Sequence, residues 1–172
     1  MDNSIVVYIS VIALSFVALS VITYNYIKRI KNRAVESTVP EEKKQEPVKV
    51  LVQTNKGDML LQLEPELMPV TVNNFMKLVS NKFYDGLLFH RIEPFLIQSG
   101  DPTSIGLNAP NRTIRLETNR ALKHKKYAVG MARLKQPHTA SSQFYILKRD
   151  VKSFDGKYAV FGKVIEGRDV VH

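Results

Sequence analysis

The sequence predicts a mainly β fold, a closed antiparallel barrel that follows one transmembrane helix. Short segments of alternating and β-branched residues recur at close spacing from residue 48 onward, with one helical pattern near their start. Such spacing favours a closed antiparallel barrel. Ahead of them the chain runs from Ile5 to Ile27 without a charged residue, a length that suffices to cross the hydrocarbon core of a bilayer as a helix.

The apolar stretch divides the N-terminal part into a short tail (1–4), a transmembrane helix (5–27), and a basic flank with a flexible linker (28–47). Tyr24 and Tyr26 stand where an interfacial aromatic belt would lie. A cleaved signal peptide is the alternative, but residues 1–4 carry no Lys or Arg and no convincing small-x-small cleavage site follows. A buried soluble helix is disfavoured because the stretch has no polar face.

Positive charge follows the apolar stretch directly and predicts its orientation. Cytoplasmic flanks of membrane spans are enriched in Lys and Arg, so we expect a single-pass membrane protein with its main domain in the cytoplasm. A short tail can insert either way, which leaves an extracytoplasmic domain as the alternative. The basic residues of the flank are Lys28, Arg29, Lys31 and Arg33.

The domain of residues 48–172 begins with a predicted hairpin. Val48–Asn55 and Met59–Leu63 alternate apolar and polar residues, and a Gly-containing turn joins them. A helix is predicted from Pro69, because proline is favourable at a first helical position and apolar residues then recur at i, i+3, i+4 and i+7. We expect this helix to end near Asn81-Lys82.

Further strands are expected after the helix, and a long polar stretch from Gly100 to Asn119 interrupts them. Each strand is short and rich in apolar or β-branched residues. They are Leu87–Ile92, Phe95–Ser99, Tyr127–Ala132, Gln143–Leu147 and Tyr158–Ile165.

Composition excludes several kinds of site. The chain has no Cys, which rules out disulfides and thiolate metal ligands. Its four His are scattered without metal-ligand spacing, so we expect no metal and no cofactor. The formal net charge of +9 raises nucleic-acid binding as a hypothesis. The basic residues form neither a long block nor an aromatic-interleaved motif, however, so no nucleic-acid partner is expected.

Four motifs follow one another along the domain. They are YDGLLFHR (Tyr84–Arg91), FLIQSGDP (Phe95–Pro102), MARLKQPHTASSQFYI (Met131–Ile146) and FDGKYAVFGKV (Phe154–Val164). In this order they resemble the cyclophilin-type peptidyl-prolyl cis–trans isomerases. The segment TNKGDMLLQLEPELMPVTVNNFMKL (Thr54–Leu78) also resembles the first hairpin and helix of that family, particularly its bacterial members. The resemblance implies a cyclophilin-like barrel with capping helices, and an enzyme that accelerates X–Pro isomerisation in proline-containing polypeptides during folding.

The chemistry of this reaction explains why an arginine is needed. Amide resonance gives the peptide bond a rotation barrier of about 18–20 kcal/mol, and twisting the bond makes the prolyl nitrogen pyramidal with a usable lone pair. A guanidinium that donates to this lone pair stabilises the transition state selectively, with no covalent intermediate. By resemblance, Arg91 is this donor and Gln98 orients it. Taken alone, Arg91 also fits a surface residue tied to Glu93 or Asp101.

The resemblance also implies a substrate-binding set around the proline. Four side chains would line the proline pocket, and the backbone at 132–133 with a glutamine would hold the preceding residue extended. His90 is expected to give structural support. The substrate-binding residues are Phe95, Leu96, Ala132, Arg133, Gln143, Tyr145, Phe154 and Tyr158.

The sequence departs from the family pattern at three places. Pro94 abuts Phe95, which shortens the turn before the pocket by one residue. Ser153 stands where relatives carry an aromatic that contributes to cyclosporin binding, so we expect weak cyclosporin affinity. The chain stops at His172, where the family pattern continues into a last strand, so we expect a fragment of a longer protein or a barrel with an open edge.

These departures keep a second function open. The alternative is a membrane-tethered, non-catalytic module or chaperone that binds proline-containing peptides without accelerating their isomerisation.

Overall fold

The computed structural model describes residues 20–31, 47–103 and 112–172. The chain divides into two compact units, Met1–Lys44 and Gln45–His172. In the first unit, residues 20–31 are helical and expose apolar side chains such as Tyr24. Within the described ranges, no helix combines the length and the apolar character needed to cross a bilayer. Most of the predicted span lies outside these ranges, at residues 5–19, so the membrane helix stays a prediction.

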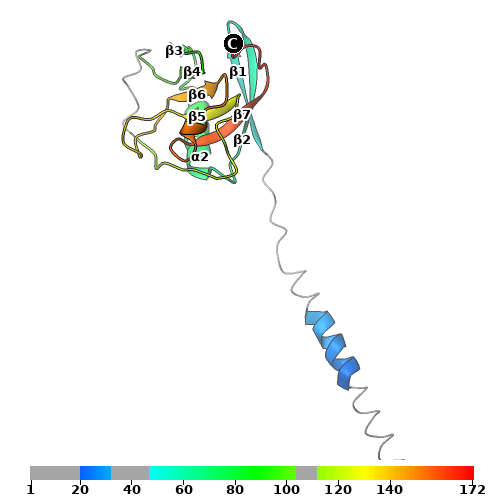
Figure 1. Cartoon of the computed structure of the whole chain (residues 1–172). Coiled ribbons are helices and arrows are strands. Elements are labelled where there is room, and N and C mark those ends of the chain that lie inside the picture. The colour runs from blue at the N-terminus through cyan, green and yellow to red at the C-terminus, as the bar shows by residue number, and fades with distance from the viewer. Residues whose placement is uncertain (1–19, 32–46, 104–111) are drawn as a thin grey trace, which may run out of the picture. The chain divides into compact units, whose positions relative to one another are not determined.

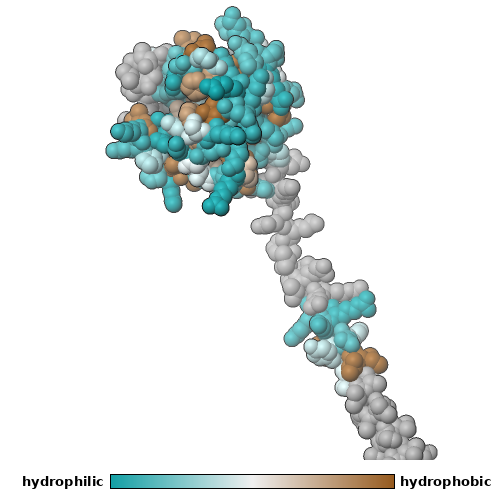
Figure 2. Space-filling view, in the orientation of Figure 1, coloured by the Kyte–Doolittle hydropathy of each residue, from teal (hydrophilic) through white to brown (hydrophobic). Residues whose placement is uncertain are grey.

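The second unit is mainly β, as predicted, and its strands form one curled antiparallel sheet (Figure 1). In spatial order the strands run β1-β2-β7-β5-β6-β4-β3. Hydrophilic side chains cover most of the visible face of this unit (Figure 2). The strands are β1 Val48–Thr54, β2 Gly57–Leu63, β3 Arg91–Ile92, β4 Leu96–Ser99, β5 Ala128–Met131, β6 Phe144–Leu147 and β7 Val160–Glu166.

The described strands form a half-barrel, and the predicted closure is not found among them. Pairing runs without interruption from β1 to β3, and no described strand joins these two edges. β3 is also much shorter than the predicted strand Leu87–Ile92. The first residues of the predicted strand do not pair with β4. The Leu87 N–H instead donates to the Tyr84 carbonyl in a turn, and the Leu88 carbonyl accepts a hydrogen bond from the Ser99 hydroxyl.

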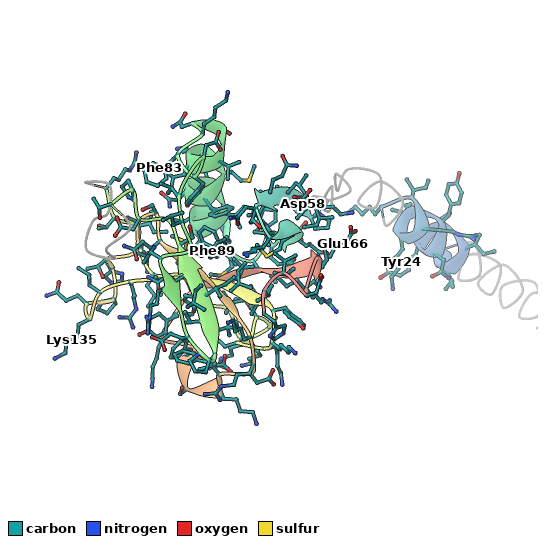
Figure 3. All side chains as sticks on the ribbon, turned by 90° about the horizontal axis from the view of Figure 1, so that it is seen from above. Tyr24, Asp58, Phe83, Phe89, Lys135 and Glu166 are labelled. Atoms are coloured by element: carbon teal, nitrogen blue, oxygen red, sulfur yellow. The ribbon has the colours of Figure 1, made fainter. Side chains whose placement is uncertain are left out.

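The first hairpin follows its prediction closely. Val48 pairs with Leu63 and Thr54 with Gly57, so the turn consists of residues 55 and 56. Gly57 has a φ of 129°, a conformation that favours glycine. The far end of β2 then pairs with β7, and Asp58 and Glu166 mark the neighbouring ends of these strands in Figure 3.

The helix α2, Pro69–Ser80, also lies where the sequence predicts it, with proline in the first turn. Its Phe75 side chain is buried and contacts Tyr84, Phe144 of β6 and Phe161 of β7 at ring-centroid distances of 5.1, 5.4 and 5.1 Å. These rings anchor the helix to the sheet. The sequence predicted more than one capping helix. Among the described residues of this unit, α2 is the only α-helix, and one short 3-10 helix, η1, spans Lys152–Phe154.

A distant carboxylate caps the start of α2. Met68 at the N-cap makes no side-chain hydrogen bond. Instead, Glu117 accepts from the backbone N–H of Val70 at 3.0 Å, and from the N–H and hydroxyl of Thr71 at 2.7 and 2.6 Å. A negative charge at this end also suits the helix dipole. The contact ties the long loop after β4 to the helix.

Replacing Glu117 with alanine should therefore lower the free energy of unfolding by about 1–3 kcal/mol, because the loss leaves the N–H and hydroxyl of the buried Thr71 without this acceptor. Urea unfolding of the variant measures this change. The matched control is Glu166→Ala, which removes an exposed glutamate side chain from a strand end and should change stability by no more than about 0.5 kcal/mol. Equal effects of the two substitutions would contradict the capping role.

Alternation along the strands separates two apolar clusters. In β6, Phe144 and Ile146 join the main core, whereas Tyr145 and Leu147 join a smaller cluster. In β4, Ile97 belongs to the main core and Leu96 to the smaller cluster. Because successive strand residues point to opposite faces, the smaller cluster lies on the other face of the sheet.

Candidate active site

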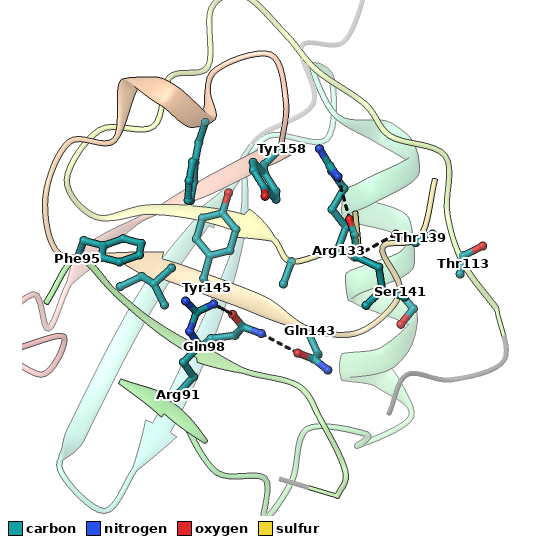
Figure 4. A pocket seen from close by; sticks show the side chains of 14 residues that line it. Arg91, Phe95, Gln98, Thr113, Arg133, Thr139, Ser141, Gln143, Tyr145 and Tyr158 are labelled. Carbon is teal, nitrogen blue, oxygen red and sulfur yellow. Dashed lines mark hydrogen bonds between the residues drawn. The ribbon is translucent and has the colours of Figure 1, made fainter. Parts of the chain in front are cut away.

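A cavity of about 290 Å³ opens on the face of the sheet that carries the smaller cluster (Figure 4). All ten residues predicted for catalysis and substrate binding line it, although they come from segments far apart in the sequence. Their individual roles remain predictions. The lining residues are Arg91, Phe95, Leu96, Gln98, Thr113, Ala132, Arg133, Leu134, Thr139, Ser141, Gln143, Tyr145, Phe154 and Tyr158.

Strand register brings Arg91 and Gln98 together at the rim of the cavity. The two residues are paired across β3 and β4, so their side chains share one face. Arg91 Nη1 donates to Gln98 Oε1 at 3.4 Å, and Arg91 Nε donates to Glu93 at 3.2 Å. The contact with Glu93 is exposed on both sides and contributes little to stability. This contact holds the Nε edge of the guanidinium, and the opposite edge is left to face the cavity.

Gln98 links the arginine to a second glutamine. Its Nε2 donates to Gln143 Oε1 at 2.7 Å, while its Oε1 accepts from Arg91. Using both ends of the amide sets its orientation. Gln98 is buried, and both ends of its amide have a hydrogen-bond partner in the cavity wall. Figure 4 shows the three side chains in line.

Aromatic rings form the apolar part of the cavity. The rings of Phe95 and Phe154 meet edge to face, with centroids 6.3 Å apart. The Phe154 ring also packs on Tyr158, with centroids 4.6 Å apart. Tyr145 lies edge to face with both Phe154 and Tyr158. The tight junction of Pro94 and Phe95 does not remove Phe95 from the cavity, because the turn closes with Glu93 N–H donating to Leu96 O at 2.8 Å.

The segment after β5 carries a structural role that the sequence did not indicate. The Arg133 guanidinium donates to the carbonyls of Lys157, Leu134 and Lys135 at 2.8–3.0 Å and lies 4.5 Å from the Tyr158 ring centroid. It thus fixes one wall of the cavity, while the Lys135 side chain points outward (Figure 3). In the backbone at 132–133, which is predicted to hold substrate, the Ala132 N–H donates to Gln143 O.

His90 and Ser153 lie outside the cavity lining. Both ring nitrogens of His90 are buried and have no hydrogen-bond partner among the described residues, so any support that His90 gives comes from packing. Ser153 is exposed on η1. Weak cyclosporin affinity, predicted from Ser153, remains a prediction.

A buried histidine behind the cavity was not predicted. His124 Nε2 bonds the Tyr145 hydroxyl at 2.9 Å, and Asp155 Oδ1 accepts from the backbone N–H and the Nδ1 of His124, both at 2.8 Å. Burial lowers the pKa of His124, and Asp155 opposes this shift only in part. The hydrogen bond from the His124 backbone lowers the pKa of Asp155. Spacing alone gave no signal, because a loop, the residue after η1 and β6 supply the three groups.

This pKa shift makes stability depend on pH. Because burial depresses the pKa of His124 below its usual 6.5, the folded state binds fewer protons than the unfolded state once the pH falls below that value. The free energy of unfolding should be fully retained well above pH 6.5 and should decrease as the pH falls below it. Melting temperatures on both sides of this pH measure the loss. A His124→Gln variant should show a smaller decrease, and identical slopes would contradict the assignment.

Known proteins are similar to this chain over the domain that holds the cavity. Residues 49–172 match the family model described as cyclophilin type peptidyl-prolyl cis-trans isomerase/CLD. A peptidyl-prolyl cis-trans isomerase of Acinetobacter baylyi is 38% identical over 71% of this chain and 69% of its own length. The isomerase CYP71 of Arabidopsis thaliana is also 38% identical, over 73% of this chain but only a fifth of its own length (20%).

Solved structures show the same fold. A cyclophilin type peptidyl-prolyl cis-trans isomerase of Cryptosporidium parvum, crystallised in the presence of the dipeptide Ala-Pro, superposes with a TM-score of 0.68 at 32% sequence identity. The match covers 72% of this chain and 82% of that chain.

Proposed function

The chain belongs to the cyclophilin-type peptidyl-prolyl cis–trans isomerases, and we propose that the cavity beside Arg91 accelerates X–Pro isomerisation in proline-containing polypeptides. In this proposal the proline ring rests on Phe95, Leu96, Tyr145 and Phe154. Arg91 donates a hydrogen bond to the prolyl nitrogen as the amide twists. The bond is weak in the planar ground state and strong in the transition state, so it lowers the barrier without any covalent step.

The single observation that carries this proposal is the placement of Arg91. Its guanidinium lies at the rim of an apolar cavity, between Glu93 on one side and Gln98 on the other. A donor that is already held in place needs little reorganisation when the transition state forms. Gln98 is in turn held by Gln143, so the donor is supported by two further side chains.

The experiment is proline-isomer exchange measured by NMR on a peptide with a single X–Pro bond. The proposal expects the purified chain to broaden the separate cis and trans signals at catalytic concentrations. Binding without exchange broadening would overturn it and favour the alternative, a module that binds proline-containing peptides without catalysis. The Cryptosporidium structure obtained with Ala-Pro suggests that short prolyl peptides are suitable probes.

We further propose that the isomerase domain is tethered to a membrane, with the domain in the cytoplasm. This proposal rests on the sequence alone, on the uncharged stretch Ile5–Ile27 and the Lys and Arg residues that follow it. Carbonate extraction of membranes from cells that express the whole chain tests the anchor, and protease protection of the domain tests the side. Release of the protein by carbonate would overturn the anchor.

A further inference from the structure

Tyr145 lines the cavity, but its hydroxyl bonds a residue that does not. The residue is almost fully buried, at 2% exposure, and its ring stands over Gly130, its partner across β5 and β6. The hydroxyl bonds His124 Nε2 at 2.9 Å and points away from Arg91 and Gln98 (Figure 4). The Tyr145 ring therefore contributes apolar surface to the cavity, while its hydroxyl is hydrogen-bonded to His124.

The hydrogen-bond pattern determines which nitrogen of His124 carries the proton. Asp155 is a carboxylate that only accepts hydrogen bonds when ionised, and hydrogen bonding lowers its pKa further. The Nδ1 atom, 2.8 Å from Asp155 Oδ1, must therefore be the protonated nitrogen. With burial lowering the pKa of His124, Nε2 is bare and accepts the O–H of Tyr145.

We infer that His124, held by Asp155, is a positioning residue that keeps the Tyr145 hydroxyl out of the proline pocket. The inference rests on the proposed isomerase function and extends it to residues that do not line the cavity. His124 acts only through Tyr145: its own side chain is 1% exposed and is absent from the cavity lining. Asp155 acts one step further back by fixing the tautomer and the orientation of the imidazole.

The position of the Tyr145 ring matters because the neighbouring walls pack on it. Phe154 and Tyr158 each meet it edge to face, with centroids 6.1 and 6.4 Å away, and His124 stacks on it at 6.2 Å. A hydroxyl without an acceptor at this depth would have to seek another partner. Any tilt of the ring that follows would shift the walls of the pocket against which the prolyl ring rests.

The test is a double-mutant cycle with His124→Leu and Tyr145→Phe, made singly and together. Contact with the prolyl ring is shared by the ground and transition states, so loss of positioning should raise KM and leave kcat nearly unchanged. We expect His124→Leu alone to raise KM by about tenfold. In the Tyr145→Phe background the same change should alter KM by no more than about twofold, because no hydroxyl remains to be placed. Equal changes in both backgrounds would overturn the inference.

Two further variants separate positioning from a merely structural role. His124→Gln retains a carbonyl that can accept the tyrosine O–H, and its KM should stay within about threefold of wild type. Asp155→Ala removes the acceptor for Nδ1 from a partly exposed site and should raise KM in the same direction as His124→Leu. A lower melting temperature with an unchanged KM in His124→Leu and Asp155→Ala would assign the network to stability alone.

An NMR measurement decides the question independently of activity. At neutral pH, the ring ¹⁵N shifts of His124 should show a protonated Nδ1 and a bare Nε2, with a slowly exchanging Tyr145 hydroxyl proton. The opposite tautomer or a doubly protonated ring would overturn the inference even if His124→Leu failed to fold. An inactive wild type that still shows the expected tautomer would instead count against the proposed function and leave the hydrogen-bond network in place.

Discussion

Replacing Arg91 with alanine should lower kcat/KM for a prolyl peptide by about 10²-fold or more, since removing one preorganised donor to transition-state charge has effects of this size. The donor is aimed at an atom that becomes a good acceptor only when the amide twists, so the loss should fall on kcat and much less on KM. Stability should change little, because the Arg91 side chain is 48% exposed and its ion pair with Glu93 lies at the surface.

Isomer exchange by NMR measures this loss of kcat/KM, and two further variants serve as controls. Arg91→Lys keeps the positive charge but not the planar fork of donors, so it should recover only a small part of the rate. Arg120→Ala removes an exposed arginine that does not line the cavity, and it should leave kcat/KM unchanged. Equal rates for Arg91→Ala and wild type would show that the guanidinium does not act on the twisted amide.

The residues of the cavity could be predicted because they lie in four short motifs that resemble those of the cyclophilin-type isomerases. Along the predicted strand Gln143–Leu147, the order Gln143, Phe144, Tyr145 indicates that the first and third residues share a face. The same holds for Leu96 and Gln98 in β4. Once the strands are in register, these side chains meet at the cavity whatever the exact strand ends are. Ala132, Arg133, Phe154 and Tyr158 lie outside the strands, and only the resemblance predicted that they line the cavity.

The interactions that were not predicted join residues far apart in the chain. The Glu117 cap on α2 spans 46 and 47 positions, and the bond between His124 and Asp155 spans 31. Neither glutamate nor histidine stands in a pattern that marks such a role, because the role depends on where the loops return to the fold. Barrel closure, predicted but not found among the described strands, likewise depends on pairing between distant edges, which strand periodicity does not specify.

The second large effect is expected from a substitution of Gly130, because the absence of a side chain at this position leaves the space that the Tyr145 ring fills. A Cβ built on Gly130 would overlap the Cζ and hydroxyl oxygen of Tyr145, so the buried ring would have to shift. Gly130 is not among the glycines with positive φ, so backbone strain plays no part. In such a conformation Gly→Ala would ordinarily stabilise a protein by about 0.4–1 kcal/mol through the unfolded state.

Gly130→Ala should instead destabilise the fold by about 1–3 kcal/mol, the usual cost of overpacking. It should also lower kcat/KM, because the displaced ring moves toward the cavity. Urea unfolding and isomer exchange measure the two effects. In a Tyr145→Ala background, where the space is free, the destabilisation caused by Gly130→Ala should disappear, which would give a coupling energy of about 1–3 kcal/mol between the two sites. A stabilised Gly130→Ala variant with wild-type activity would show that the ring does not depend on this glycine, and that the pocket tolerates movement of Tyr145.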